Sequence, residues 1–188
     1  NYRNFLKEQK NDFYYQSKLI FHDLLHNNPD EAMELYEQLC RIYALNIREY
    51  LEREDYMDCC FLLAEEYEKR GEFVKAYQHL KIIVLEEQLK AYFRHFIEEV
   101  VDRLRTITCF KMPSILPPRL ILDYLNELIN FDFSKKDNAF FYKKISEVYA
   151  ELGDEETAVH FLQKGLSLDK NLAGVKKLKD KLGYTQAS

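Results

Sequence analysis

The sequence predicts an all-α protein assembled from antiparallel helix pairs, and three observations lead to this fold class. Nearly every segment of the 188-residue chain places its apolar residues at helical spacing. Glycine occurs 5 times and proline 4 times, which is too few for the many turns of a β-sandwich or barrel. One pattern of residues also occurs twice, around Gly71 and around Gly153. Such self-similarity is typical of stacked helical arrays.

The two copies of this pattern agree at five positions counted from the glycine. Positions −8, −7, −4, +5 and +9 hold large or small residues in the same order in both copies. They are Leu63, Ala64, Tyr67, Ala76 and Leu80 around Gly71, and Ile145, Ser146, Tyr149, Ala158 and Leu162 around Gly153. Each copy therefore predicts one helix before its glycine and one helix after it.

The N-terminal part of the chain is expected to contain three helices before the first of these glycines. The first covers residues 2–26 and ends at Asn27-Asn28-Pro29, since proline cannot continue a helix. The second covers residues 30–53. The third begins with Asp55 as its N-cap and ends at Arg70, with Gly71 in the C′ position.

The fourth predicted helix is unusually long, because no helix breaker occurs between Glu72 and Met112. Its apolar stripe alternates spacings of four and three, at Phe93, Ile97, Val100, Leu104 and Ile107. A helix of about 35 residues is about 50 Å long. Its stripe suits either packing on the following helices or a seam between two copies of the chain.

The proline-rich segment 111–118 is expected to be an extended connector. It would join an N-terminal helical array, residues 1–110, to a C-terminal helical region, residues 119–188. Further helices are expected from Pro118 onward and over residues 139–152, 154–168 and 172–182, which gives about eight helices in all.

Residues 139–172 resemble the tetratricopeptide repeat, a 34-residue unit of two antiparallel helices. The matching residues are Tyr142, Ile145, Ser146, Tyr149, Ala158, Leu162 and Gly165. Residues 57–90 resemble it in part, with Ile83 where a small residue is usual, and Ala32 and Tyr36 belong to a third, degenerate copy. The two glycines lie 82 residues apart, 14 more than two repeats require. The long helix and the connector account for the excess.

The resemblance implies a short right-handed α-solenoid with one extended helix. Members of the family usually bind a peptide or a helix in a concave groove lined by the first helix of each pair. The corresponding positions here are Phe61, Glu65, Lys143, Lys144 and Glu147. One subgroup clamps a peptide carboxylate with Lys and Asn, but these positions include no Asn and two Glu, which would repel it. We therefore expect an amphipathic helix or a basic, apolar segment as the ligand.

The function expected from these observations is that of a non-enzymatic adaptor or scaffold that binds another protein and needs no cofactor. A second hypothesis is a regulatory or sensor module. The long helix resembles the end of repeat arrays in bacterial signalling proteins, where it leads to an output domain or a dimer. In this case the chain would dimerise through that helix or transmit a signal along it.

Catalytic and metal-binding motifs are weak in this sequence. His22-Asp23-Leu24-Leu25-His26 resembles a zinc-binding H-E-x-x-H helix, but no third ligand follows it. We expect these histidines at a surface or an interface, with no metal. The sequence contains no nucleophile–base spacing, glycine-rich phosphate loop or paired carboxylate motif, so no enzymatic activity is expected.

The net charge narrows the class of partner, and the cysteine content narrows the cellular compartment. The net charge of −5 disfavours nucleic-acid binding. Residues 30–72 carry a net charge of −8 and residues 135–181 one of +2. These charges either form solvated outer helix faces or steer a basic partner toward the N-terminal part. Cys40, Cys59, Cys60 and Cys109 form no C-x-x-C pair, which predicts reduced thiols and a cytoplasmic location. No apolar stretch is long enough for a membrane span.

Overall fold

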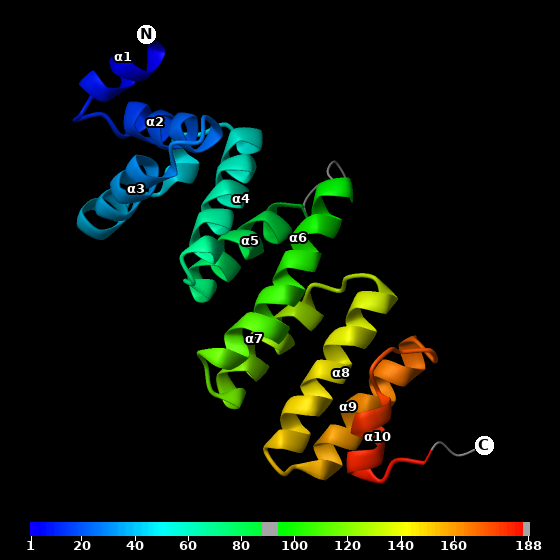
Figure 1. The fold of residues 1–188 in the computed structure, drawn as a ribbon. Coiled ribbons are helices and arrows are strands. Elements are labelled where there is room, and N and C mark those ends of the chain that lie inside the picture. Colours follow the sequence, from blue (N-terminus) through cyan, green and yellow to red (C-terminus); the bar gives the residue numbers. More distant parts are fainter. Residues whose placement is uncertain (88–93, 186–188) are drawn as a thin grey trace. The chain divides into compact units, whose positions relative to one another are not determined.

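The structure, a computed structural model, describes residues 1–87 and 94–185 of the chain. Within these ranges all regular secondary structure is helical, with ten α-helices rather than about eight (Figure 1). The chain divides into two compact units, Asn1–Leu104 and Arg105–Ser188. The division falls near the end of α6 (Arg94–Thr106), whereas the sequence predicts the boundary at the proline-rich segment 111–118. Each unit is described below by itself.

The first unit is built from paired helices. It contains α1 (Tyr2–Glu8), α2 (Phe13–Leu25), α3 (Pro29–Tyr43), α4 (Arg53–Lys69), α5 (Phe73–Glu87) and most of α6 (Arg94–Thr106), with a 3-10 turn at Ile47–Glu49. Helix α2 packs against α3, and α4 packs against α5. Helices α2 and α4 also touch, so the two pairs lie side by side.

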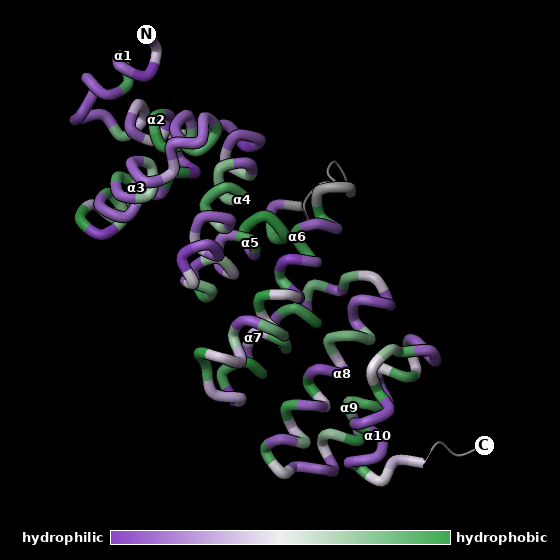
Figure 2. The backbone as a smooth tube through the Cα atoms, in the orientation of Figure 1, coloured by the Kyte–Doolittle hydropathy of each residue, from purple (hydrophilic) through white to green (hydrophobic). Residues whose placement is uncertain are grey.

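The second unit repeats this arrangement of neighbouring helices. After a π-helical turn at Ile107–Lys111 and a 3-10 turn at Met112–Ser114, it contains α7 (Pro118–Asn130), α8 (Lys135–Glu151), α9 (Glu155–Leu168) and α10 (Lys176–Leu182). Helix α8 packs along α9 and against α7, and α10 packs against α9. Figure 2 shows short hydrophobic and hydrophilic runs alternating along α8 and α9, as expected of helices with one buried face.

The helix pairs α4/α5 and α8/α9 turn in the same way. Gly71 and Gly153 adopt left-handed backbone angles, with φ of 73° and 84°. In each turn the N–H group after the glycine donates to a tyrosine carbonyl five residues back, from Glu72 to Tyr67 and from Asp154 to Tyr149, both at 2.9 Å. This is a Schellman motif, which glycine favours because it has no Cβ to clash. The predicted C′ role of Gly71 is confirmed.

Helices α2 and α3 meet in a third turn of the same kind, in which Asn27 stands where the other pairs have glycine. Its φ is 57°, and Asn28 N–H donates to the Asp23 carbonyl at 2.8 Å. Ala32 follows at the +5 position and is buried. Asparagine tolerates the left-handed region better than most residues. The predicted end of the helix at Asn27-Asn28-Pro29 and the small position of Ala32 are confirmed, with Asn27 in the place of the glycine.

The positions of the repeated pattern form the contact between paired helices. Leu63, Ala64, Tyr67, Ala76, Leu80, Ile145, Ser146, Ala158, Leu162 and Gly165 are buried, whereas Tyr142 and Tyr149 are half-buried. The Ser146 hydroxyl donates to the Ala158 carbonyl at 2.5 Å, and Tyr149 stacks on Phe161 with ring centroids 5.6 Å apart. Small residues allow the two backbones to approach closely, and the aromatic rings fill the flanking space.

The prediction of a single first helix over residues 2–26 is wrong, because the helical conformation is interrupted between α1 and α2. The side chain of Asp12 accepts from Tyr14 N–H at 2.9 Å and starts α2 as its N-cap. The buried Gln16 amide donates to the Gln9 carbonyl at 2.9 Å, which satisfies the end of α1. These local bonds compete with a continuous helix and allow α1 to fold back on α2.

The prediction of a second helix over residues 30–53 is also wrong beyond Tyr43, where α3 ends. Ala44 has a φ of 50° and ends α3, and Glu52, not Asp55, is the N-cap residue of α4. Ile47 and Leu51 lie after this break and are buried. Burying both side chains requires the chain to leave the α3 axis, so tertiary packing outweighs local helix propensity.

The predicted extended helix corresponds to α5 and α6, and its continuity depends on residues 88–93, which lie outside the described residues. Val100, Leu104 and Ile107 of its stripe are buried. These three residues therefore pack within the chain, and a seam between two copies stays a prediction. The connector is not extended throughout, because Met112–Ser114 forms a 3-10 turn and Pro118 begins α7.

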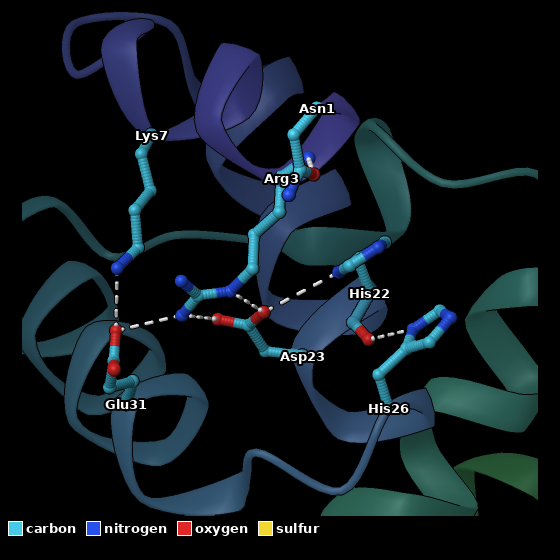
Figure 3. A network of polar contacts seen from close by, with 7 residues as sticks. All are labelled: Asn1, Arg3, Lys7, His22, Asp23, His26 and Glu31. Atoms are coloured by element: carbon cyan, nitrogen blue, oxygen red, sulfur yellow. Dashed lines mark hydrogen bonds and ion pairs between the residues drawn. The ribbon is translucent and has the colours of Figure 1, made fainter.

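The short helix α1 is held by charged contacts to α2 and α3 (Figure 3). Asp23 is 2% exposed, and its two carboxylate oxygens accept from Arg3 Nε and Nη2 at 2.7 and 3.0 Å. The same Arg3 Nη2 donates to Glu31 at 2.8 Å, and Lys7 reaches Glu31 at 2.9 Å. Paired contacts of this kind are the stronger form of side-chain hydrogen bond.

We expect Arg3→Met to release α1, because a buried Asp23 carboxylate without its cation is costly to keep dry. Amide hydrogen exchange of residues 2–8 should become faster than in the wild type. Lys7→Met is the matched control, since its partner Glu31 is exposed and still pairs with Arg3. Equal exchange rates in the two variants would contradict this role for the Arg3–Asp23 pair.

Gly165→Val should lower the free energy of unfolding by about 1–3 kcal/mol, as overpacking of a close helix contact does. A Cβ at this position would lie 3.1 Å from the Ala139 carbonyl oxygen and 3.2 Å from Leu172 Cδ2. The control is Gly153→Asn, since a Cβ there meets nothing within 4 Å and asparagine tolerates its positive φ. Urea denaturation measures both, and a larger loss in the control would refute the close-approach argument.

Candidate functional site

The candidate partner-binding residues lie on two helices in different units, so they form two groups. Phe61 and Glu65 belong to α4 in the first unit. Lys143, Lys144 and Glu147 belong to α8 in the second unit. The two groups are described separately.

On α4, the ring of Phe61 is covered by a cation. The guanidinium carbon of Arg103, on α6, lies 4.5 Å from the ring centroid, and Arg103 Nη2 pairs with Glu68 at 2.7 Å. Glu65 is half-buried and lies 3.9 Å from Lys69 along the same helix. Phe61 therefore packs within the first unit, and Glu65 and Lys69 form the more open part of this group.

Helix α8 carries its polar candidates along one face. Ser134 caps the helix by accepting from the Asp137 N–H at 3.1 Å, which fixes where the helix starts. From that start, residues spaced by three and four share a face. Lys136, Phe140, Lys143 and Glu147 follow this spacing, as do Phe140, Lys144 and Glu147, and the two lysines point about 100° apart.

The outer part of this face contains an exposed aromatic residue that sequence reasoning missed. Phe110, on the π-helical turn, is 61% exposed, and the Lys144 ammonium lies 5.0 Å from its ring centroid. Lys144 also pairs with Glu147 at 3.0 Å. A lone phenylalanine ahead of the proline-rich segment has no distinguishing sequence signal. Its exposure depends on how the turn is folded. We call Lys144 and Glu147 of α8, together with Phe110 of the π-helical turn, the α8 outer face.

Lys143 is placed differently from its neighbour Lys144, because it is buried at 7% exposure. Its ammonium donates to the Ala173 carbonyl at 3.0 Å and lies 4.8 Å from the Phe140 ring centroid. Burial lowers the pKa of Lys143, while Glu147 acts in the opposite direction. Lys143 is therefore directed toward the loop before α10 rather than an open groove.

A pocket of about 500 Å³ lies beside Lys143. Its lining carries three cationic side chains and one carboxylate, together with an aromatic ring and the loop before α10: Arg105, Lys136, Phe140, Lys143, Asp169, Asn171, Leu172, Ala173 and Gly174. Arg105 lies 5.4 Å from the Phe140 ring centroid and pairs with Asp137 at 3.4 Å. We call this cavity the Lys143 pocket. Its lining is positively charged and of a size that small ligands occupy.

The first unit contains a buried histidine at the junction of α3 and α5. His79 Nδ1 donates to the Lys75 carbonyl at 2.7 Å, because a carbonyl can only accept. Its Nε2 then accepts from the Tyr36 hydroxyl at 2.9 Å. Burial lowers the pKa of His79. The arrangement fits a neutral ring whose two nitrogens both make hydrogen bonds within the first unit.

The histidine segment that resembles a zinc-binding helix is engaged in other contacts (Figure 3). The rings of His22 and His26 stack with centroids 4.1 Å apart, and His26 Nδ1 donates to the His22 carbonyl at 2.7 Å. The intervening Asp23 is occupied by Arg3. Within the described ranges, His, Cys, Asp and Glu side chains form no group of three that could hold a metal ion.

Comparisons with known proteins do not assign a function. No protein-family model matches the chain, and searches of curated proteins and of solved structures find no significant match. Among the described residues, none of the helices combines the length and apolarity needed to cross a bilayer.

The His79 arrangement makes stability depend on pH. Its pKa is lowered in the folded chain from 6.5, so below that value the unfolded chain binds more protons. The free energy of unfolding should therefore fall as the pH falls below about 6.5, by at most about 1.4 kcal/mol per pH unit. His79→Gln should remove this slope. Urea denaturation between about pH 5.5 and 7 measures it, and equal slopes in both proteins would contradict the assignment.

Proposed function

We propose that this chain is a non-enzymatic protein-binding module whose partner contacts the α8 outer face. The observation that carries the proposal is the 61% exposure of the Phe110 ring beside the Lys144–Glu147 ion pair. Aromatic residues are enriched at the energetic centres of protein interfaces, and charged residues commonly surround them. Such a face suits an amphipathic helix or a peptide with an apolar side chain and charges of both signs.

We further propose that the helix pairs are degenerate repeats of a tetratricopeptide-like right-handed solenoid. Three pairs support this: α2/α3, α4/α5 and α8/α9 each turn at a left-handed residue, Asn27, Gly71 or Gly153. Each turn is followed at the +5 position by a buried alanine, at Ala32, Ala76 and Ala158. Arrays of this kind commonly present extended binding surfaces.

The polar side chains around His79 and Asp23 already make hydrogen bonds or ion pairs within the protein. This supports a binding role rather than a catalytic one. His79 uses both ring nitrogens in bonds to Tyr36 and Lys75, and Asp23 is occupied by Arg3. A catalytic acid or base needs an atom that can reach a substrate. All four cysteines carry free thiols, which suits a reducing compartment such as the cytoplasm.

The proposal is tested by affinity capture with the purified chain and quantitative mass spectrometry. Phe110→Ala should weaken capture of the true partner about 30-fold, the loss expected at an interface centre worth about 2 kcal/mol. Leu120→Ala is the matched control, because Leu120 is a 46% exposed apolar residue of α7 in the same unit. It should leave capture unchanged.

Site-specific photo-crosslinking and light scattering complete the test. A photoreactive residue at position 110 should crosslink to the captured partner, and one at position 120 should not. Light scattering shows whether the partner is a second copy of this chain. If every captured protein is retained equally by the Phe110→Ala variant and none crosslinks at position 110, the α8 outer face is not the binding surface.

A further inference from the structure

We propose that the Lys143 pocket binds a compact oxyanion, the carboxylate or phosphate group of a ligand. The pocket lies within the second unit and is lined by α8, Arg105 and the loop before α10. The inference goes beyond the protein-binding role proposed for the α8 outer face, because Phe110, Lys144 and Glu147 do not line this cavity.

The feature that points to an anion is the ammonium group of Lys143. It is 7% exposed, and among the described residues its one hydrogen bond goes to the Ala173 carbonyl at 3.0 Å. An ammonium group has three N–H donors. Leaving charged donors buried without acceptors is unfavourable. An oxyanion in the adjacent cavity would supply both the acceptors and the opposite charge.

Glu147 lies near Lys143 in the sequence and Asp169 lies in the pocket lining, but both carboxylates contact other groups. Glu147 pairs with Lys144 at 3.0 Å. Asp169 accepts from the Asn171 N–H at 3.0 Å, a bond that shapes the loop before α10. Among the described residues, no carboxylate lies within ion-pairing distance of Lys143. The protein therefore gives this cation no direct ion pair, and the charge of Glu147 acts on it only through space.

Two further cations increase the positive charge of the cavity. Arg105 and Lys136 line it together with Lys143, against the carboxylate of Asp169 in the lining and that of Asp137, which pairs with Arg105 at 3.4 Å. The Phe140 ring lies 5.4 Å from the Arg105 guanidinium carbon and 4.8 Å from the Lys143 ammonium, so an apolar surface adjoins the charges. A ligand with an oxyanion attached to a short apolar group fits this combination.

The loop before α10 is shaped around the ammonium group. Gly174 has a φ of 73°, and a Cβ built there would lie 3.0 Å from Lys143 Nζ. The positive φ favours glycine at this position, and the backbone there lies close to the end of the Lys143 side chain. The loop before α10 therefore contacts the ammonium group at Ala173 and Gly174.

Isothermal titration calorimetry and NMR with sodium phosphate and sodium succinate test the proposal at about 0.1 M salt. The wild-type chain should bind at least one of these ions, with shifts of the amides of residues 169–174 and a raised pKa of Lys143 on binding. Lys143→Met should weaken binding at least tenfold. Lys164→Met is the control, since Lys164 contacts Tyr142 and Phe161 outside the pocket. It should bind as the wild type does.

A second arm distinguishes a free small molecule from a peptide. Acetylated acidic peptides with a free C-terminal carboxylate are compared with the same peptides as C-terminal amides. Loss of binding on amidation identifies a chain terminus as the source of the oxyanion, whereas tighter binding of phosphate or succinate identifies a small molecule. Either result supports the pocket, provided that Lys143→Met abolishes it.

Failure of the proposal is recognised independently of folding and of the α8 outer face. Lys143→Met should fold at least as well as the wild type, because it removes a buried charge, and circular dichroism checks this. Phe110→Ala should keep anion binding. The proposal is overturned if none of the probes binds at about 10 mM, an affinity too weak for recognition, or if a folded Lys143→Met binds as tightly as the wild type.

Discussion

The left-handed turn between paired helices is the constraint on which the rest of the structure depends. At Gly71 and Gly153 the chain must take a positive φ for the next N–H to reach the tyrosine carbonyl of the preceding helix. This bond fixes the direction in which the following helix leaves. The buried alanine at the +5 position then allows the two backbones to approach. A bulky side chain at the alanine position would separate the pair, whereas at the glycine position the constraint is the positive φ, because an added Cβ meets nothing within 4 Å.

The first helix pair meets the same constraint with different residues, and the difference explains α1. Asn27 replaces the glycine, and Asp23 stands at the −4 position that tyrosine holds in the other pairs. A buried carboxylate needs a cation, which Arg3 of α1 supplies. The residue that departs from the pattern is thus the one that anchors an additional helix, and its two neighbouring histidines serve packing.

In the second unit, one aromatic ring separates two kinds of polar surface. The Phe140 ring lies 4.8 Å from the Lys143 ammonium and 5.7 Å from that of Lys144. Lys143 is buried against the loop before α10, while Lys144 lies beside the exposed Phe110. Consecutive helical residues point about 100° apart. Two adjacent lysines can therefore contribute to the Lys143 pocket and to the α8 outer face.

The sequence alone determined what depends on local rules. The all-helical class follows from apolar spacing and from the scarcity of glycine and proline. The turn at Gly71 follows from the C′ preference of glycine, and the burial of the matching positions follows from their helical register. The tertiary structure decided the breaks after Glu8 and Tyr43, where capping and the burial of Ile47 outweigh helix propensity. It also decided that Lys143 is buried and Phe110 exposed, because both depend on contacts between segments far apart in the chain.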